Sequence, residues 1–197
     1  MNPTDPVIAA SRFGLGARPG ELVRIGARPR GWLLDQLDGP SRLPGVLRDL
    51  PDSASLFAEM QTIRRDQREA TRNDEDVVKK YGRFVREHYV RQASARYRHA
   101  AKTDLPFHDR LVHFWSNHFA VSADKQPIGA VAGHYREEAI RPHVTGNFRE
   151  LLTAVAKHPA MLLYLDNRLS SAPAADFGPG DMQFLASRSL RERGLPL

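Results

Sequence analysis

Cysteine is absent from this chain, which excludes disulfides, thiolate zinc sites and a cysteine nucleophile. The chain also has no run of about eighteen or more apolar residues, so the sequence predicts no transmembrane helix. The first residues, MNPTDPVIAASRFGLG, lack the basic and apolar stretches of a secretory signal, and the cytoplasm is the expected location. No alternating pattern of apolar and polar residues indicates a β-strand.

The composition is that of a soluble globular protein, with 41% hydrophobic and 26% charged residues. A length of 197 residues suits one ordinary domain or a piece of a larger one. The net charge of +6 is concentrated in one place. Residues 64–102 hold 12 Lys and Arg against 6 Asp and Glu, whereas basic and acidic residues are equal in number over the rest of the chain.

Prolines and capping residues divide the chain into helical segments. Pro29 precedes RGWLLDQL and Pro106 precedes FHDRLVHFW, and proline is favoured in the first turn of a helix. The pair Asp52-Ser53 offers an N-cap for a long helix. The pattern predicts an all-α fold, an irregular array of about seven or eight helices with a long central helical hairpin over residues 52–102.

The amino-acid composition and the periodicity of the sequence change near its C-terminal end. Residues 1–169 are expected to form the helical domain, with a polar break near Asn73 and Asp74 between two long helices. Residues 170–197 begin with SSAPAADFGPGD, a Pro/Gly/Ala/Ser stretch typical of a linker. The last residues, SRSLRERGLPL, show no strong periodic face. This segment is therefore interpreted as a linker followed by a tail.

The basic segment has three interpretations. It can follow a nucleic-acid backbone, bind an anionic surface, or form the solvated face of a helical hairpin. The arginines are spread around the helix, and no stacking-aromatic pattern of an RNA-binding module accompanies them, so nucleic acid is disfavoured. Arg83 and Arg86 are the binding candidates in this segment.

Residues 111–125, LVHFWSNHFAVSADK, contain two histidines among aromatic residues. On a helical wheel of about 100° per residue, His118 lies near Trp115 and Phe119, whereas His113 lies on the other side. The histidines are not at the i, i+4 spacing that lets two histidines of one helix bind the same metal ion. The sequence therefore predicts no metal site here.

His118 is expected on the apolar face of that helix, where a ring is desolvated and biased towards its neutral form. Such a histidine is either a satisfied core residue or, where a cleft reaches it, a proton-transfer group. Trp115 shares this face. We take His118 as a catalytic candidate and Trp115 as a binding candidate.

The opposite side of the same helix carries Asp109, His113 and Asn117 at i, i+4 intervals. A row of this kind can fix the tautomer of the imidazole, as an orienting carboxylate does. The alternative is an exposed row of hydrogen-bonding side chains. His113 is a second catalytic candidate, and Asn117 is a further binding candidate.

Asp166 ends the apolar segment HPAMLLYLDN, which is expected to be a short helix. A carboxylate at the C-terminal end of a helix opposes the helix dipole, so a partner for Asp166 is expected: an arginine, a backbone cap or a functional group. The alternative is that Asp166 and Asn167 begin a turn. Asp166 is the third catalytic candidate.

Several stretches carry a family resemblance, in this order: RFGLGARPGE, GWLLDQL, RLVHFWSNHFAVSADK and EEAIRPHVTGNFRELLTAVAKHPAMLLYLDN. Over residues 11–169 they resemble the N-terminal portion of a bacterial domain-of-unknown-function family, DUF1800. The resemblance implies a mostly helical protein, and it implies that residues 1–169 are the N-terminal part of a larger family domain. Residues 170–197 do not match the family's continuation, so a truncation or a frameshift in this segment is expected.

Two functions follow from these patterns. The first is an interaction or scaffold module whose basic hairpin and aromatic helix bind another protein or an anionic surface. The second is a hydrolase-like enzyme, incomplete in this short chain, that uses an acid–base or metal cluster. No cofactor is assigned. The cluster would be drawn from His113, Asn117, His118, Asp124, Lys125, His158 and Asp166.

Overall fold

The computed structural model describes residues 4–38, 43–69 and 75–167, and these residues contain helices and no strand. The expected all-α class is therefore confirmed. The expected linker and tail over 170–197 and the break near Asn73 and Asp74 lie outside the described residues. The α-helices are α1 (Asp5–Ile8), α2 (Glu21–Ile25), α3 (Pro29–Leu34), α4 (Gly45–Arg48), α5 (Ser53–Glu69), α6 (Glu75–Lys102), α7 (Pro106–His118), α8 (Ala132–Tyr135), α9 (Phe148–Lys157) and α10 (Pro159–Tyr164).

Four tighter or wider helical turns join these helices in the described residues. Two are π-helical, η1 (Ala9–Phe13) and η3 (Arg136–Ile140), and two are 3₁₀ turns, η2 (Ile128–Ala130) and η4 (Arg141–His143). The segment from α8 to η4 is nearly continuous. Most of its side chains are buried, so it is the central element around which the longer helices pack.

Local sequence signals set several helix starts. Pro29, Pro106 and Pro159 each stand in the first turn of a helix, because a missing N–H costs nothing there. The Asp52 carboxylate accepts a hydrogen bond from the backbone N–H of Ser55 at 2.7 Å, which confirms the expected N-cap of α5. That hydrogen bond lowers the pKa of Asp52 below its ordinary value.

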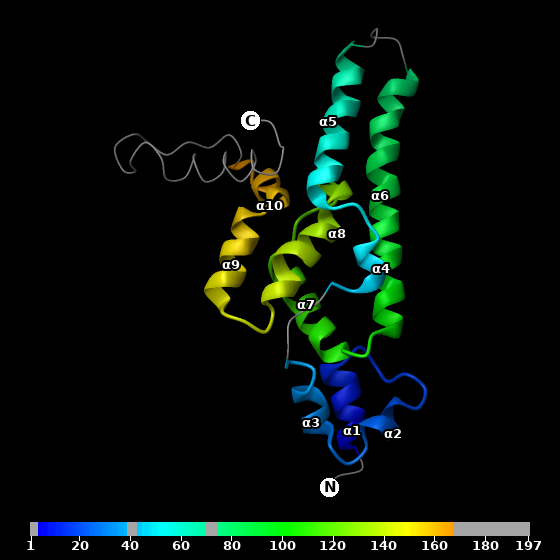
Figure 1. Cartoon of the computed structure of the whole chain (residues 1–197), viewed down its shortest axis with the longest axis vertical. Coiled ribbons are helices and arrows are strands. Elements are labelled where there is room, and N and C mark those ends of the chain that lie inside the picture. The colour runs from blue at the N-terminus through cyan, green and yellow to red at the C-terminus, as the bar shows by residue number, and fades with distance from the viewer. Residues whose placement is uncertain (1–3, 39–42, 70–74, 168–197) are drawn as a thin grey trace, which may run out of the picture.

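The two longest helices, α5 and α6, lie side by side and project from one end of the molecule (Figure 1). Leu56 and Met60 of α5 are buried together with Tyr81 and Phe84 of α6. The Tyr81 hydroxyl donates to the Met60 sulfur at 3.8 Å. Apolar residues at helical spacing therefore bind these two helices to each other.

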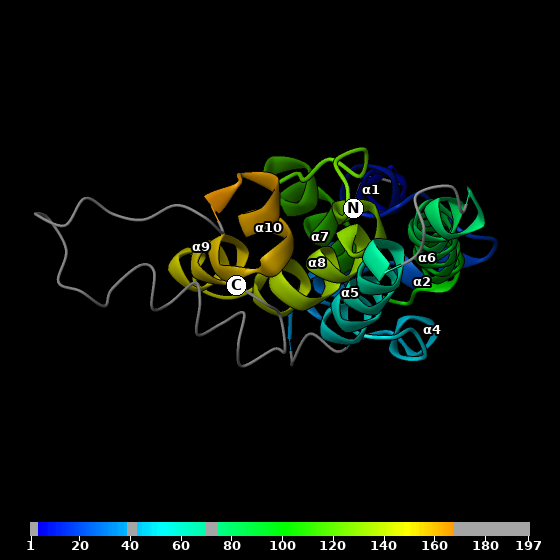
Figure 2. The same cartoon turned by 90° about the horizontal axis from the view of Figure 1, so that it is seen from above.

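The remaining elements lie on different sides of this pair. Helices α7 and α8 lie in the middle of the molecule, α9 and α10 lie to one side, and α1 to α3 form the end opposite the tip of α5 and α6 (Figures 1 and 2). The main core contains Val112 of α7, Ile140 of η3 and Leu151 of α9. A small separate core around Ile25 holds η1, α2 and α3 together.

None of the helices in these described ranges is both long and apolar enough to cross a membrane.

Candidate functional site

The side of α7 that faces the interior is its polar side. His108, Asp109 and Val112 are buried, whereas Phe114 is 59% exposed. Leu111, Trp115 and Phe119 of the expected apolar face are partly buried against the main core, but Phe114 and His118 of that face are exposed. The Asp109 carboxylate is buried because it has two partners in the interior. Arg141 Nη2 lies 2.8 Å from one of its oxygens, and His99 Nε2 lies 2.9 Å from the other.

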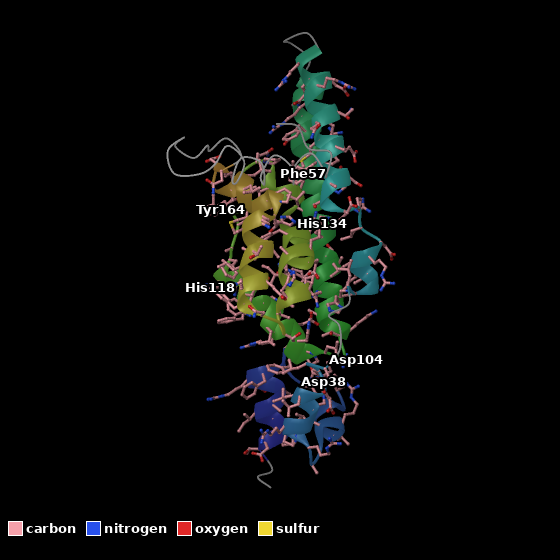
Figure 3. All side chains as sticks on the ribbon, turned by 60° about the vertical axis from the view of Figure 1, so that its left-hand side comes forward. Asp38, Phe57, Asp104, His118, His134 and Tyr164 are labelled. Atoms are coloured by element: carbon pink, nitrogen blue, oxygen red, sulfur yellow. The ribbon has the colours of Figure 1, made fainter. Side chains whose placement is uncertain are left out.

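His118 is exposed, so the expected core position is wrong. Its ring meets Trp115 and Phe119 edge-on, with centroids 5.6 and 4.7 Å apart, but these contacts cover only part of it. Figure 3 shows His118 at the margin of the molecule and His134 nearer the middle. The expectation failed because α7 ends at His118, and in the described part of the chain the ring is met by Trp115 and Phe119 alone.

The aromatic side of α7 packs against α9. Trp115, a binding candidate, is half-buried, stacks on Phe119 at a centroid distance of 5.8 Å, and meets Phe148 of α9 at 5.6 Å. Asn117, the other candidate on this helix, is exposed and lies at the edge of the cavity described below. Trp115 therefore contributes to the packing of α7 on α9, while the Asn117 side chain is exposed to solvent.

His113 is half-buried, and the expected row of Asp109, His113 and Asn117 does not form. Asp109 binds His99 and Arg141 instead, and no hydrogen bond joins it to His113 among the described residues. Burial lowers the pKa of His113, and repulsion from nearby arginines lowers it further. His113 therefore favours its neutral form.

Asp166 has a partner, and the partner is a lysine. Lys125 Nζ lies 2.7 Å from the Asp166 carboxylate and donates at 2.7 Å to the Tyr164 carbonyl, which caps the C-terminal end of α10. Asp166 itself adopts a positive φ of 59°, a conformation that Asp and Asn tolerate. The Asp166 side chain is 79% exposed, so the pair closes a turn at the surface.

The structure does not bring His113, His118 and Asp166 together. Of the wider set, Lys125 contacts Asp166 as described, and Asp124 is exposed. His158 is buried, and its Nδ1 accepts a hydrogen bond from the backbone N–H of Ala160 at 3.1 Å. Its Nε2 therefore carries the proton and faces a Glu138 oxygen at 3.2 Å.

Glu138 connects three parts of the fold. One carboxylate oxygen accepts from the Ser53 backbone N–H at 3.0 Å and the other from the Ser53 hydroxyl at 2.6 Å, in addition to His158. Burial acts to raise the pKa of Glu138, but the hydrogen bonds from His158 and Ser53 outweigh it and lower that pKa to about 2. Glu138 thereby fixes the starts of α5 and α10 against η3.

A second buried group contains Asp109, Glu137 and Arg141. Arg141 reaches Asp109 at 2.8 Å and hydrogen-bonds Glu137, and all three side chains are less than a tenth exposed. Burial acts to raise the pKa of Asp109, but His99 and Arg141 hold it well below its usual range. These charges pair α7 with η3 and η4 inside the protein.

A cavity of about 390 Å³ lies between α4, α6, α7, α8 and η3. His134 is buried on its wall, and the Nε2 of His134 has no hydrogen-bond partner among the described protein atoms. Burial lowers the pKa of His134, while the carboxylates of Glu138 and Asp52 oppose that shift. The polar residues around the cavity are Arg48, Asp52, Gln92, Arg96, Ser116, Asn117, His134, Arg136, Glu137 and Glu138.

The sequence reasoning missed most of this polar wall. The signal was present in IGAVAGHYREEAIRPHV (residues 128–144), where charged residues interrupt an otherwise apolar segment. Charges within a segment that must be buried require partners or a ligand. The i, i+4 spacing of Glu137 and Arg141 is the part of this pattern that a helical wheel detects.

Arg83 and Arg86, the candidates on α6, are both exposed. They lie opposite the stripe of Tyr81, Phe84 and Val85 that packs into the core. Their side chains are therefore open to solvent, and the cavity is not lined by either of them.

In the part of the chain that the structure describes, no three His, Asp or Glu side chains converge as metal ligands. Comparison with curated proteins and with solved structures gives no match. Residues 8–176 match the family described as "Protein of unknown function (DUF1800)", which confirms the resemblance and covers most of the chain. With its all-helical fold and its polar interior now described, the chain belongs to the DUF1800 family.

Proposed function

We propose that this protein is an interaction module and that the outward face of α6 binds an acidic segment of a partner protein. The observation that supports this proposal is that positive charge and exposed apolar surface occur together on that face. Val90 is 51% exposed and Tyr97 is 67% exposed, and Arg83 and Arg86 are exposed on the same side of the helix.

The charge on this face has little internal compensation. Between residues 79 and 102, Glu87 is the single acidic residue. Exposed cations over the same stretch include Lys80, Arg83, Arg86, Arg91, Arg98 and Lys102. An acidic partner gains from this field both in its rate of encounter and in its orientation.

Arginine together with tyrosine favours a protein partner over a lipid surface. These residue types are enriched at protein interfaces and among the residues that dominate binding energy. A helix that lies in a membrane surface needs a continuous apolar face on the lipid side. On α6 the continuous apolar stripe, which includes Phe84 and Val85, is already buried in the core.

The test begins with a photo-crosslinking amino acid in place of Tyr97, introduced in the native cells. The crosslinked protein is identified, purified and titrated against the full chain. The double variant Arg83→Glu/Arg86→Glu is expected to weaken binding by about tenfold or more, and to make binding less sensitive to salt.

The matched control is Arg30→Glu/Arg149→Glu, which makes the same change in net charge at two exposed positions on other helices. It is expected to bind like the wild type. Equal binding by the α6 double variant and the wild type contradicts the proposal. So does crosslinking from position 97 to phospholipid in place of protein.

A second candidate function is a hydrolase-like enzyme, which one observation favours: the buried His134 ring lines the cavity with a free Nε2. A histidine of this kind suits proton transfer at neutral pH. In this candidate His134 takes the proton-transfer role that the sequence assigned to His118. Activity on p-nitrophenyl esters and phosphates is expected to fall about a hundredfold in His134→Gln, with His143→Gln as control, and equal rates would exclude it.

A further inference from the structure

Arg136 is a buried cation without a full set of partners. Its side chain is 7% exposed and lies on the wall of the cavity. Its Nε is 3.4 Å from a Glu137 oxygen, which is an ion-pair distance, but Nε and Nη1 have no hydrogen-bond partner among the described protein atoms. Buried guanidinium N–H groups that lack an acceptor are costly to a folded protein.

The only neighbouring carboxylates with which Arg136 interacts in the described structure are already engaged. Glu137 forms its hydrogen bond with Arg141, and Asp109 pairs with Arg141 and His99. Arg136 and Arg141 thus draw on the same two carboxylates, Glu137 and Asp109. The positive charges of Arg96 and Arg141 also act on Arg136, which lies beside the cavity.

The cavity's other acidic groups do not supply the missing acceptor. Glu138 is satisfied by Ser53 and His158, and Asp52 caps α5. The buried polar atoms of the cavity wall that lack a described protein partner are all nitrogens: Arg96 Nε, His134 Nε2, Arg136 Nε and Arg136 Nη1. Three of these four are permanent N–H donors, since arginine carries no acceptor.

We infer that the cavity is a binding site for a small molecule carrying an oxyanion group, phosphate or carboxylate, held between Arg96 and Arg136. Guanidinium groups match the planar, multidentate geometry of such anions. The volume of about 390 Å³ lies within the range of small-molecule sites. Asn117, exposed at the cavity edge, gives the ligand a neutral polar contact near the opening.

An oxyanion bound here satisfies the Arg136 guanidinium, which no described protein group does fully. It supplies acceptors for Nε and Nη1, and its negative charge offsets the repulsion among Arg96, Arg136 and Arg141. The site is separate from the outward face of α6, so the inference does not depend on the proposed interaction function. It also does not require that the protein catalyse a reaction.

The test measures binding of inorganic phosphate and of citrate to the full chain by calorimetry, and by thermal unfolding at ionic strength held constant with potassium chloride. The wild type is expected to bind at least one of them saturably and to unfold at a higher temperature in its presence. The phosphate and citrate arms distinguish the two oxyanion classes, and binding of either one supports the inference.

The variant Arg136→Met is expected to lose about tenfold or more in affinity, because a hydrogen-bonded charge pair is removed. Arg96→Met is expected to lose a comparable factor. Arg91→Met is the matched control, since Arg91 is exposed on the same helix and does not line the cavity. It is expected to bind like the wild type.

Three results would overturn the inference. One is the absence of saturable binding of both anions by the wild type. Another is unchanged affinity in Arg136→Met. If Arg136→Met does not fold, Arg96→Met decides, and unchanged affinity in that variant is the third.

Discussion

The two sides of α7 differ in what they touch and in what their removal should cost. On one side, Asp109 and His108 are buried, and Asp109 is paired with Arg141 and His99. On the other, Phe114 and His118 are exposed, although Trp115 between them packs on α9. The charged side is therefore the structural side of this helix, and the aromatic side is partly open to solvent.

This difference shows that partners, more than polarity, decide which face is buried. A carboxylate enters the interior when the interior already holds a cation and hydrogen-bond donors at the right distance. An aromatic ring stays half-exposed when only one neighbouring helix reaches it. The burial of α7 is thus set by residues on other elements, His99 on α6 and Arg141 on η4.

Asp109→Asn is expected to have the largest effect on stability, because it removes the central charge on the buried side of α7. The substitution leaves Arg141 with Glu137 alone and removes a buried negative charge. We expect a loss of about 3–5 kcal/mol in the free energy of unfolding, measured by urea denaturation. The control Asp124→Asn alters an exposed carboxylate and should change stability by less than about 0.5 kcal/mol. Similar effects from both would show that Asp109 is not a buried structural charge.

Acid titration of Glu138 tests the second group of buried polar residues. Its pKa is about 2 in the fold against an ordinary 4.5, so its ionised form stabilises the protein above pH 4.5. That contribution is lost as the pH falls from about 4.5 towards about 2. Glu138→Gln should cost about 2 kcal/mol at neutral pH, and the difference from the wild type should close within that window.

Unfolding curves between pH 2 and pH 7 check this expectation for both proteins. Glu150→Gln, at an exposed position of α9, serves as the control and should follow the wild type. A stability difference for Glu138→Gln that does not vary with pH would contradict the assignment.

The two histidines compare the two sides of α7 directly. His113→Ala removes a half-buried ring and should lower the free energy of unfolding by about 1–2 kcal/mol. His118→Ala removes an exposed ring and should cost less than about 0.5 kcal/mol. Thermal and urea unfolding of both variants measures the order, and a larger loss for His118 would restore the orientation that the helical wheel predicted.

The smallest effect is expected from Asp166→Asn. Asparagine tolerates the positive φ of this position, and the lost ion pair with Lys125 is largely exposed. The free energy of unfolding should change by less than about 0.5 kcal/mol. A loss above about 2 kcal/mol would place Asp166 among the buried charges instead.

The parts of the fold that could be predicted are those set by neighbouring residues. Pro106 at the start of α7 and Asp52 capping α5 act within one turn of the chain, and the all-helical class follows from such signals. The orientation of α7 could not be predicted, because it depends on His99 and Arg141. The cavity could not be predicted either, since its wall combines residues from five elements.

Gln92 sets the position of α6 along its own axis. Its side-chain amide donates to the Ala130 carbonyl and accepts from the Gly133 N–H at 2.8 Å. A Cβ atom at position 133 would lie 2.9 Å from the Gln92 Cβ, so the close approach requires glycine. If α6 slid by one turn, both hydrogen bonds would be lost. Gln92 and Gly133 therefore act as a lock on the axial register of α6, and they keep its arginines at one fixed height relative to His134 and Arg136.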